Sequence, residues 1–163
     1  MQIELDININ EQAWAAQQVQ LDQYCHQLIT KTFAITNLIK ANIIEVSLLL
    51  TNNEQIAELN KQYRKIDKAT NVLSFPNYNF VTDNVKETEF VNIGDVVIAY
   101  ETMQQEAAEQ NKSFDDHFAH LFIHSILHLI GYDHIQANEQ NIMEKLEIEI
   151  LNQFSINNPY EPI

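Results

Sequence analysis

The stretch FAHLFIHSILHLIGYDH, residues 118–134, carries four of the six histidines in the chain. Histidines and apolar residues recur in it at intervals of three and four, which is the spacing of helix faces. Gly131 predicts the end of this helix, since glycine readily adopts the left-handed conformation that follows a helix C-terminus. Upstream, Ser113 followed by Asp116 resembles a capping box in which Asp replaces the usual Glu or Gln. We therefore expect a helix that begins after Ser113 and is closed by Gly131.

Three of these histidines have the spacing of a metal site. His124 and His128 lie one helical turn apart, about 6 Å along the axis, so both imidazoles can reach one ion. After Gly131 the chain can reverse and bring His134 back as a third ligand. Three protein ligands leave one tetrahedral position open, which is typical of catalytic rather than structural zinc. The sequence therefore predicts one Zn²⁺ per chain, held by His124, His128 and His134.

Other polar residues of this stretch have more than one interpretation. His117 and His120 share the helix face, and we expect them to line the pocket, form hydrogen bonds in the core or lie at the surface. Asp133 can orient an imidazole or serve as a general base. It can equally be a turn residue whose side chain binds its own backbone. The sequence leaves both interpretations of Asp133 open.

The same letters almost fit the zinc peptidase pattern H-E-x-x-H-x-x-G-x-x-H. In this chain the corresponding residues 124–134 are HSILHLIGYDH, and only Ser125 departs from the pattern. The glutamate of those peptidases is the general base for the zinc-bound water, and a serine hydroxyl does not titrate near neutral pH. A zinc metallopeptidase is therefore an alternative that the sequence disfavours.

The rest of the chain alternates short strands with helices. Residues 2–10, QIELDININ, alternate apolar with polar side chains, which is the period of a half-buried strand. The other expected strands are Glu45 to Thr51, Asn71 to Phe75 and Asp95 to Tyr100. The expected helices run from about Glu11 to Ala41 (broken near its start), from Asn52 or Asn53, from Tyr100 to about Gln110, and from about Ala137 to Phe154. The polar segment from Asn77 to Asn92 is expected to be a loop. This order indicates a small α/β or α+β fold in a single domain, residues 1–163.

The charge distribution bears on the class of partner. A formal net charge of −14 repels nucleic acid phosphates at long range. Four of the nine basic residues, however, fall within eight positions: Lys61, Arg64, Lys65 and Lys68. Composition alone favours a solvated helix end for them, because basic side chains are stabilised near a helix C-terminus.

The composition also bears on the compartment. The chain has one cysteine, Cys25, so no internal disulfide can form, and we expect this residue to be buried in a helix. No apolar run approaches the roughly 18–20 residues of a membrane span. The first residues include Glu4, Asp6 and Glu11, and the first basic residue is Lys31, unlike a secretory signal. We expect a cytoplasmic protein without membrane contact.

Three separate stretches resemble the YbeY family of bacterial metal-dependent endoribonucleases, also described as ribosomal RNA maturation factors. LNKQYRKIDKATNVLSFP, residues 59–76, is similar to the family pattern L-N-x-x-Y-R-x-x-D-x-P-T-[DN]-V-L-S-F-P. GDVVIA, residues 94–99, is similar to G-D-I-V-I-S. HFAHLFIHSILHLIGYDH, residues 117–134, with the later MEKLEIEIL, is similar to H-G-x-L-H-L-x-G-Y-D-H followed by M-E-x-x-E. The visible departures are Ala69 in place of Pro and Ser125 in place of Gly.

The resemblance implies an activity and a fold. The implied activity is a single-strand-specific, metal-dependent endoribonuclease that acts in maturation of the 3′ end of small-subunit (16S) ribosomal RNA and in ribosome quality control. The implied fold is α+β (α/β-like), with a small mixed four-stranded sheet, about five helices and a zincin-like three-His metal site. The resemblance assigns these residues to function: zinc ligands His124, His128 and His134, a phosphate contact by Arg64, and RNA binding by Lys61, Arg64, Lys65 and Lys68.

The resemblance also implies a mechanism and partners. Zinc would activate a water molecule or polarise a phosphoryl oxygen, and Arg64 would stabilise charge on the phosphate. Asp133 or a neighbouring histidine would transfer the proton. RNA is the expected partner and DNA is not, while ribosomal proteins or the small ribosomal subunit are further candidates. A non-catalytic ribosome-assembly factor is a second alternative, because an acidic protein can dock on basic ribosomal proteins.

Overall fold

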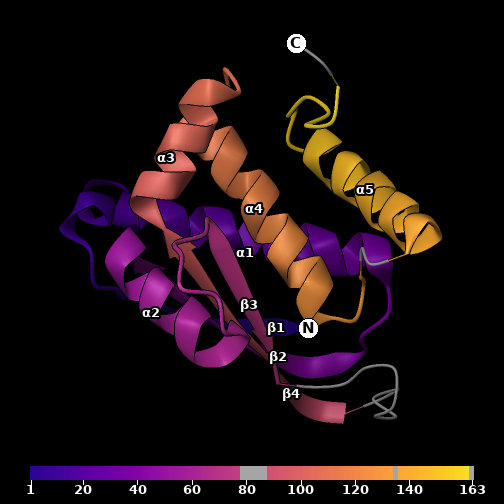
Figure 1. The fold of residues 1–163 in the computed structure, drawn as a ribbon. Helices are drawn as coiled ribbons and strands as arrows, with labels where there is room; N and C mark the ends of the chain where they lie inside the picture. Colours follow the sequence, from indigo (N-terminus) through magenta and orange to yellow (C-terminus); the bar gives the residue numbers. More distant parts are fainter. Residues whose placement is uncertain (78–87, 134–135, 162–163) are drawn as a thin grey trace.

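The computed structural model describes residues 1–77, 88–133 and 136–161 (Figure 1). Strands and helices alternate in the first part of the chain, and helices gather in the second, which confirms the expected α+β class. The elements are, in order, β1 (Gln2–Ile9), the 3-10 helix η1 (Gln12–Gln17), α1 (Gln18–Thr36), β2 (Ala41–Thr51), α2 (Asn53–Arg64), β3 (Val72–Pro76), β4 (Thr88–Ala99), α3 (Tyr100–Glu109), α4 (Phe114–Leu129) and α5 (Ala137–Asn152).

The four strands form one mixed sheet in the order β1-β2-β4-β3. β1 pairs in parallel with β2, and β2 in parallel with β4. β3 runs antiparallel to β4 and lies at the edge of the sheet. Along β1, exposed and half-buried residues alternate, as the period of its sequence predicts. The mixed four-stranded sheet that the resemblance implies is confirmed.

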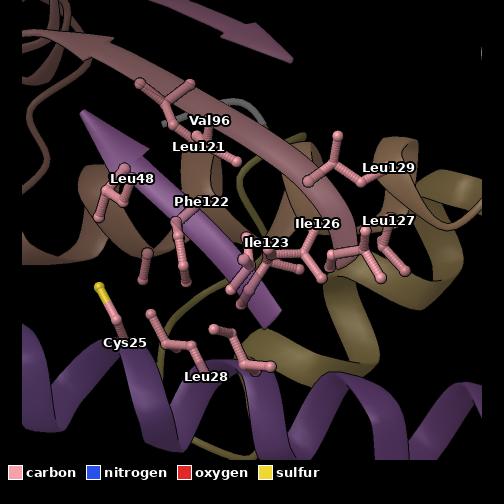
Figure 2. Packing of buried hydrophobic residues seen from close by; sticks show 14 of the residues in the cluster. Cys25, Leu28, Leu48, Val96, Leu121, Phe122, Ile123, Ile126, Leu127 and Leu129 are labelled. Atoms are coloured by element: carbon pink, nitrogen blue, oxygen red, sulfur yellow. The ribbon is translucent and has the colours of Figure 1, made fainter. Parts of the chain in front are cut away.

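The larger apolar core lies between the sheet and the helices α1 and α4, with α5 packed against both helices. Figure 2 shows Cys25 and Leu28 of α1 facing the part of the core that contains Leu48 of β2 and Val96 of β4. Phe122 of α4 lies in the same cluster and is fully buried. Each fully buried side chain of this size contributes roughly 1.5–3 kcal/mol to folding. The packing fixes the rotation of α4 about its axis.

A smaller core lies on the opposite face of the sheet, where α2 packs against β3 and β4. Successive side chains of a strand point to opposite faces, so Val96 and Ile98 enter the larger core while Val97 and Ala99 enter the smaller one. The buried members of the smaller core are Ile56, Leu73, Val97 and Ala99. β3 therefore contacts both α2 and α4.

One boundary differs from the sequence prediction near residue 40. α1 ends at Thr36 and β2 begins at Ala41, within the segment that was expected to be helical. Asn37 has φ 48°, a left-handed conformation that ends the helix. The predicted break near the start of the helix is confirmed, since residues 12–17 form η1 and Trp14 is buried there.

The start of β4 also differs from the sequence prediction. Residues 88–92, which were expected to belong to a loop, form the first part of this strand, and residues 78–87 of the expected loop lie outside the described residues. Val91 and Ile93 are buried in the larger core and alternate with the partly exposed Asn92. The polar composition of the segment from Asn77 to Asn92 hid this strand start in the sequence.

Gly94 is required where β4 approaches β3. It has φ +129°, and a Cβ atom there would lie 2.2 Å from the carbonyl oxygen of Phe75 and 3.1 Å from Cδ2 of Leu129. Any side chain at this position would therefore force the backbone of β3 to move. Because Phe75 and Leu129 both lie close to Gly94, the C-terminal end of α4 lies against this end of β3.

The cysteine and the helices bear on two expectations from composition. Cys25 is fully buried in α1 as expected, and burial raises the pKa of its thiol, which keeps the thiol protonated and unreactive. Across the described ranges, no helix is both long enough and apolar enough to cross a membrane.

Candidate metal centre

α4 begins and ends as the sequence predicts. The Ser113 hydroxyl accepts a hydrogen bond from the backbone N–H of Asp116 at 3.1 Å, which caps the first turn. The last helical residue is Leu129, and Gly131 follows with φ 110°. Only glycine adopts this conformation without strain, so it marks the bend that leads to Asp133.

His124 is oriented by a glutamate of α5. Its Nδ1 atom lies 2.6 Å from Oε1 of Glu147. The Glu147 side chain is 1% exposed, whereas the His124 side chain is 30% exposed and therefore reachable from solvent. Because a carboxylate accepts hydrogen bonds, Nδ1 of His124 is the donor. The packing of α5 against α4 brings the two residues together.

His128 is oriented by the backbone that follows the helix. Its Nδ1 atom lies 3.1 Å from the carbonyl oxygen of Tyr132. A carbonyl oxygen only accepts, so Nδ1 of His128 is again the donor. Tyr132 follows Gly131 directly, and the bend that ends the helix therefore also supplies the acceptor for His128.

These two hydrogen bonds decide which ring nitrogen can bind a metal. With the proton on Nδ1, the neutral imidazole carries its lone pair on Nε2. Histidines that bind metals characteristically donate their other ring N–H to a carboxylate or a backbone carbonyl. The described residues therefore fit a metal bound through Nε2 of His124 and Nε2 of His128.

The third predicted ligand, His134, lies outside the described residues, so the complete trio remains a prediction. Among the residues that the structure does describe, no three His, Cys, Asp or Glu side chains are grouped so that they could hold a metal ion. Asp133 is half-buried at the bend that precedes His134. Both interpretations of its role remain predictions.

His117 forms a hydrogen bond inside the core. The residue is 2% exposed, and its Nε2 atom lies 3.1 Å from Oε1 of Glu106 on α3. The same carboxylate accepts a hydrogen bond from the side-chain amide of Asn71 at 2.9 Å. Of the three expected interpretations, hydrogen bonding in the core therefore describes His117, which links α3, α4 and the start of β3.

His120 lies one turn before His124 and faces the segment that follows α5. Its Nε2 atom lies 3.2 Å from the hydroxyl of Tyr160 and 3.8 Å from Oε1 of Glu147. Burial, as the largest cause, lowers the pKa of His120 to about 4, so this imidazole is neutral at neutral pH.

Glu147 is a residue of this site to which the sequence analysis assigned no role, although it is the second Glu of the M-E-x-x-E pattern. Helical spacing indicates that Glu147 lies on the buried face of α5, because it follows Met143 by four residues and precedes Ile150 by three, and both of these residues are buried. A glutamate on a buried helix face needs a hydrogen-bond donor, since burial of an unpaired carboxylate costs several kcal/mol. Glu149, in the same run of residues, is exposed.

The basic cluster of Lys61, Arg64, Lys65 and Lys68 lies at the C-terminal end of α2. Lys61 and Arg64 belong to the last turn, and Lys65 caps the helix with φ 62°. All four residues are exposed, and the Lys61 ammonium lies 3.9 Å from a carboxylate oxygen of Asp67. This position agrees with a solvated helix end and also leaves the cluster accessible to a large ligand.

A groove of about 550 Å³ lies between α2 and the sheet. Leu59 and Tyr63 of α2, Phe75 of β3 and Asp95 of β4 are among the residues that line it. Tyr63 is 61% exposed, and its ring lies edge-on to that of Phe75 with 5.3 Å between centroids. The groove therefore contains an exposed aromatic ring, that of Tyr63, which precedes Arg64 in the chain.

The ends of α2 and α4 lie against the same end of β3. Tyr63 contacts the ring of Phe75, and the carbonyl oxygen of Phe75 lies where Leu129 approaches the sheet. Tyr63 precedes Arg64 in the chain, and Leu129 follows His128. The helix end that carries Arg64 and the helix end that carries His128 therefore approach β3 from the two faces of the sheet.

Comparison with known proteins places the chain in a family. The sequence model of the family described as Endoribonuclease YbeY matches residues 6–155. The chain belongs to the YbeY family. The Endoribonuclease YbeY of Rhizobium johnstonii is 48% identical over 117 residues, which are 72% of this chain and 67% of that protein. The solution structure of TM1509 from Thermotoga maritima has a TM-score of 0.56 and 23% identity, and the match covers 97% of this chain and 96% of that one. This second likeness shows a shared fold.

Ser125, which replaces a glycine of the YbeY pattern, should lower the stability of the helix that carries His124. The residue is 0% exposed, and its Oγ atom has no hydrogen-bond partner within the described part of the protein. A buried hydroxyl without a partner costs about 1–3 kcal/mol. We therefore expect Ser125→Ala to raise the free energy of unfolding of the metal-free protein by about 1 kcal/mol, measured by urea denaturation.

The same substitution at the helix N-terminus is a matched control. Ser113→Ala removes the hydroxyl that caps α4 and should lower the free energy of unfolding by about 1 kcal/mol. If Ser125→Ala instead lowers the free energy of unfolding, the Ser125 hydroxyl has a stabilising partner and our description of its surroundings is wrong.

Proposed function

We propose that this protein is a zinc-dependent endoribonuclease that cuts single-stranded RNA, with the ion held by His124, His128 and His134. Membership of the YbeY family supports the endoribonuclease role. The observation that carries the metal site is the pair of Nδ1 hydrogen bonds, which Glu147 and the Tyr132 carbonyl accept. They hold two rings of one helix in the tautomer that presents Nε2 to a metal.

The chemistry of the proposed reaction is divided between the ion and the side chains. Bound zinc would supply a Lewis acid that lowers the pKa of a water molecule or polarises a phosphoryl oxygen. Arg64 would donate two parallel hydrogen bonds to phosphate oxygens and stabilise the negative charge that develops there. Asp133, at the bend next to His134, would accept the proton of the attacking oxygen.

The groove beside α2 supports single-stranded RNA as the substrate. Unpaired bases stack on exposed aromatic rings, and the backbone of a single strand follows positive charge. Tyr63 supplies such a ring, and the basic cluster lies at the same helix end. The acidic remainder of the protein repels RNA, so binding would depend on this local surface.

The natural substrate that we propose is the 3′ end of 16S ribosomal RNA. This proposal rests on the motif resemblance over residues 59–76, 94–99 and 117–134. We further propose that the protein acts in the cytoplasm on the small ribosomal subunit, where its acidic surface would contact basic ribosomal proteins.

A cleavage assay with two substrates tests this function. Zinc-loaded protein should cut single-stranded RNA and leave casein intact, because Ser125 stands where a zinc peptidase has its general base. Chelation should stop the RNA cleavage, and added zinc should restore it. Cleavage of casein, or cleavage of RNA that persists after complete removal of metal, would contradict the proposal.

A further inference from the structure

The segment that follows α5 returns to α4 and brings Tyr160 to the buried Glu147. The Tyr160 hydroxyl forms a hydrogen bond with Oε2 of Glu147, and Nε2 of His120 lies 3.2 Å from the same hydroxyl. The rings of Tyr160 and His120 meet edge-on, with 5.4 Å between their centroids. Tyr160 is therefore fixed at this position by its ring and by its hydroxyl.

The direction of each hydrogen bond in this network follows from its acceptors. The Glu147 carboxylate accepts from His124 at Oε1 and from Tyr160 at Oε2. Because the Tyr160 hydroxyl donates its one proton to Glu147, its oxygen accepts the Nε2–H of His120. The lowered pKa of His120 agrees with this arrangement, since the neutral ring has one N–H to donate.

Each oxygen of Glu147 thus has one donor, and each donor comes from a different part of the chain. Glu147 is 0% exposed, so solvent is not available to replace a lost donor. Without the Tyr160 hydroxyl, Oε2 would lose its hydrogen bond, and the carboxylate would rotate or shift to recover one. The hydrogen bond to Nδ1 of His124 depends on the same carboxylate.

We propose that Tyr160 is a positioning residue for the metal centre, which holds the Glu147 carboxylate in the orientation that fixes the His124 ring. The proposal rests on the proposed function, because it requires that His124 binds zinc. Tyr160 does not touch the ion or the reacting phosphate in this account. Its contribution is to the order of His124, and therefore to zinc affinity.

The test is Tyr160→Phe, which removes only the hydroxyl. Loss of a group that orients a metal ligand typically weakens metal binding about 10- to 100-fold, and we expect about 10-fold here because Glu147 itself remains. Zinc affinity is measured by competition with a chromophoric chelator. Substitution of Co²⁺ adds a spectroscopic readout, because a displaced His124 changes the visible absorption bands of the bound cobalt.

Three further variants serve as references. Tyr24→Phe makes the same chemical change at a tyrosine that packs against Phe154, and it should bind zinc as the unmodified protein does. Glu147→Gln should weaken zinc binding at least as much as Tyr160→Phe. His124→Ala should lose tight zinc binding.

The outcomes separate this inference from the proposed function. Zinc affinity of Tyr160→Phe equal to that of Tyr24→Phe, with zinc binding lost in His124→Ala, would overturn the role of Tyr160 alone. Unchanged zinc binding in His124→Ala would overturn the proposed function and the inference together. A Tyr160→Phe protein that does not fold would show a packing role for the hydroxyl and would also overturn the inference. Weakened zinc binding in a folded Tyr160→Phe protein is the result that we expect.

Discussion

Replacement of His128 with alanine should abolish both zinc retention and RNA cleavage. Two imidazoles would remain of the three that we propose, and loss of one of three ligands leaves the ion without a stable tetrahedral site. The helix itself should persist, because the apolar residues of α4 on the other side supply its packing. Zinc content is measured by elemental analysis of the purified variant, and cleavage is measured with labelled single-stranded RNA.

His26→Ala is the matched control for this variant. His26 lies on α1, its side chain is 41% exposed, and it pairs with Asp22 at 3.5 Å. The control variant should retain zinc and cleave RNA at the rate of the unmodified protein. RNA cleavage at full rate by a zinc-free His128→Ala protein would show that the reaction does not use the metal.

Replacement of Arg64 with alanine should slow RNA cleavage about a hundredfold while zinc content stays unchanged. Removal of one preorganised donor to a developing negative charge typically costs 10²–10³-fold in rate. Arg64 lies on α2, whereas the predicted ligands His124 and His128 lie on α4, so metal retention should not depend on it. Single-turnover cleavage and elemental analysis of the same preparation separate the two effects.

The matched variants are Arg64→Lys and Lys145→Ala. Lysine keeps the charge but lacks the planar fork of donors, so Arg64→Lys should recover only part of the lost rate. Lys145 is exposed on α5, outside the basic cluster, and its replacement should leave cleavage unchanged. An Arg64→Ala protein that turns over RNA at the normal rate would remove Arg64 from the mechanism.

Local features of the fold could be predicted because each depends on residues close in sequence. The start of α4 follows from the Ser113 side chain and its end from Gly131, and both are observed. The strand character of residues 2–9 follows from alternation of apolar and polar residues. Burial of Cys25 follows from the small apolar character of this side chain in a helix.

Features that depend on contacts between distant residues could not be predicted. Glu147 meets His124 across 23 positions, and Tyr160 meets His120 across 40, so neither pairing has a local sequence period. The first part of β4 was expected to be a loop because the segment from Asn77 to Asn92 is polar and irregular in sequence, yet Val91 is buried in the larger core. In each case tertiary packing decides the structure.

X-ray absorption at the zinc K-edge of the zinc-loaded protein tests the central claim most directly. Our account predicts one zinc per chain, with three imidazole nitrogens at about 2.0–2.1 Å and one oxygen from solvent. A sulfur ligand from Cys25, or a fourth protein side chain in place of the solvent oxygen, would contradict it, because no position would then be open for a reacting phosphate.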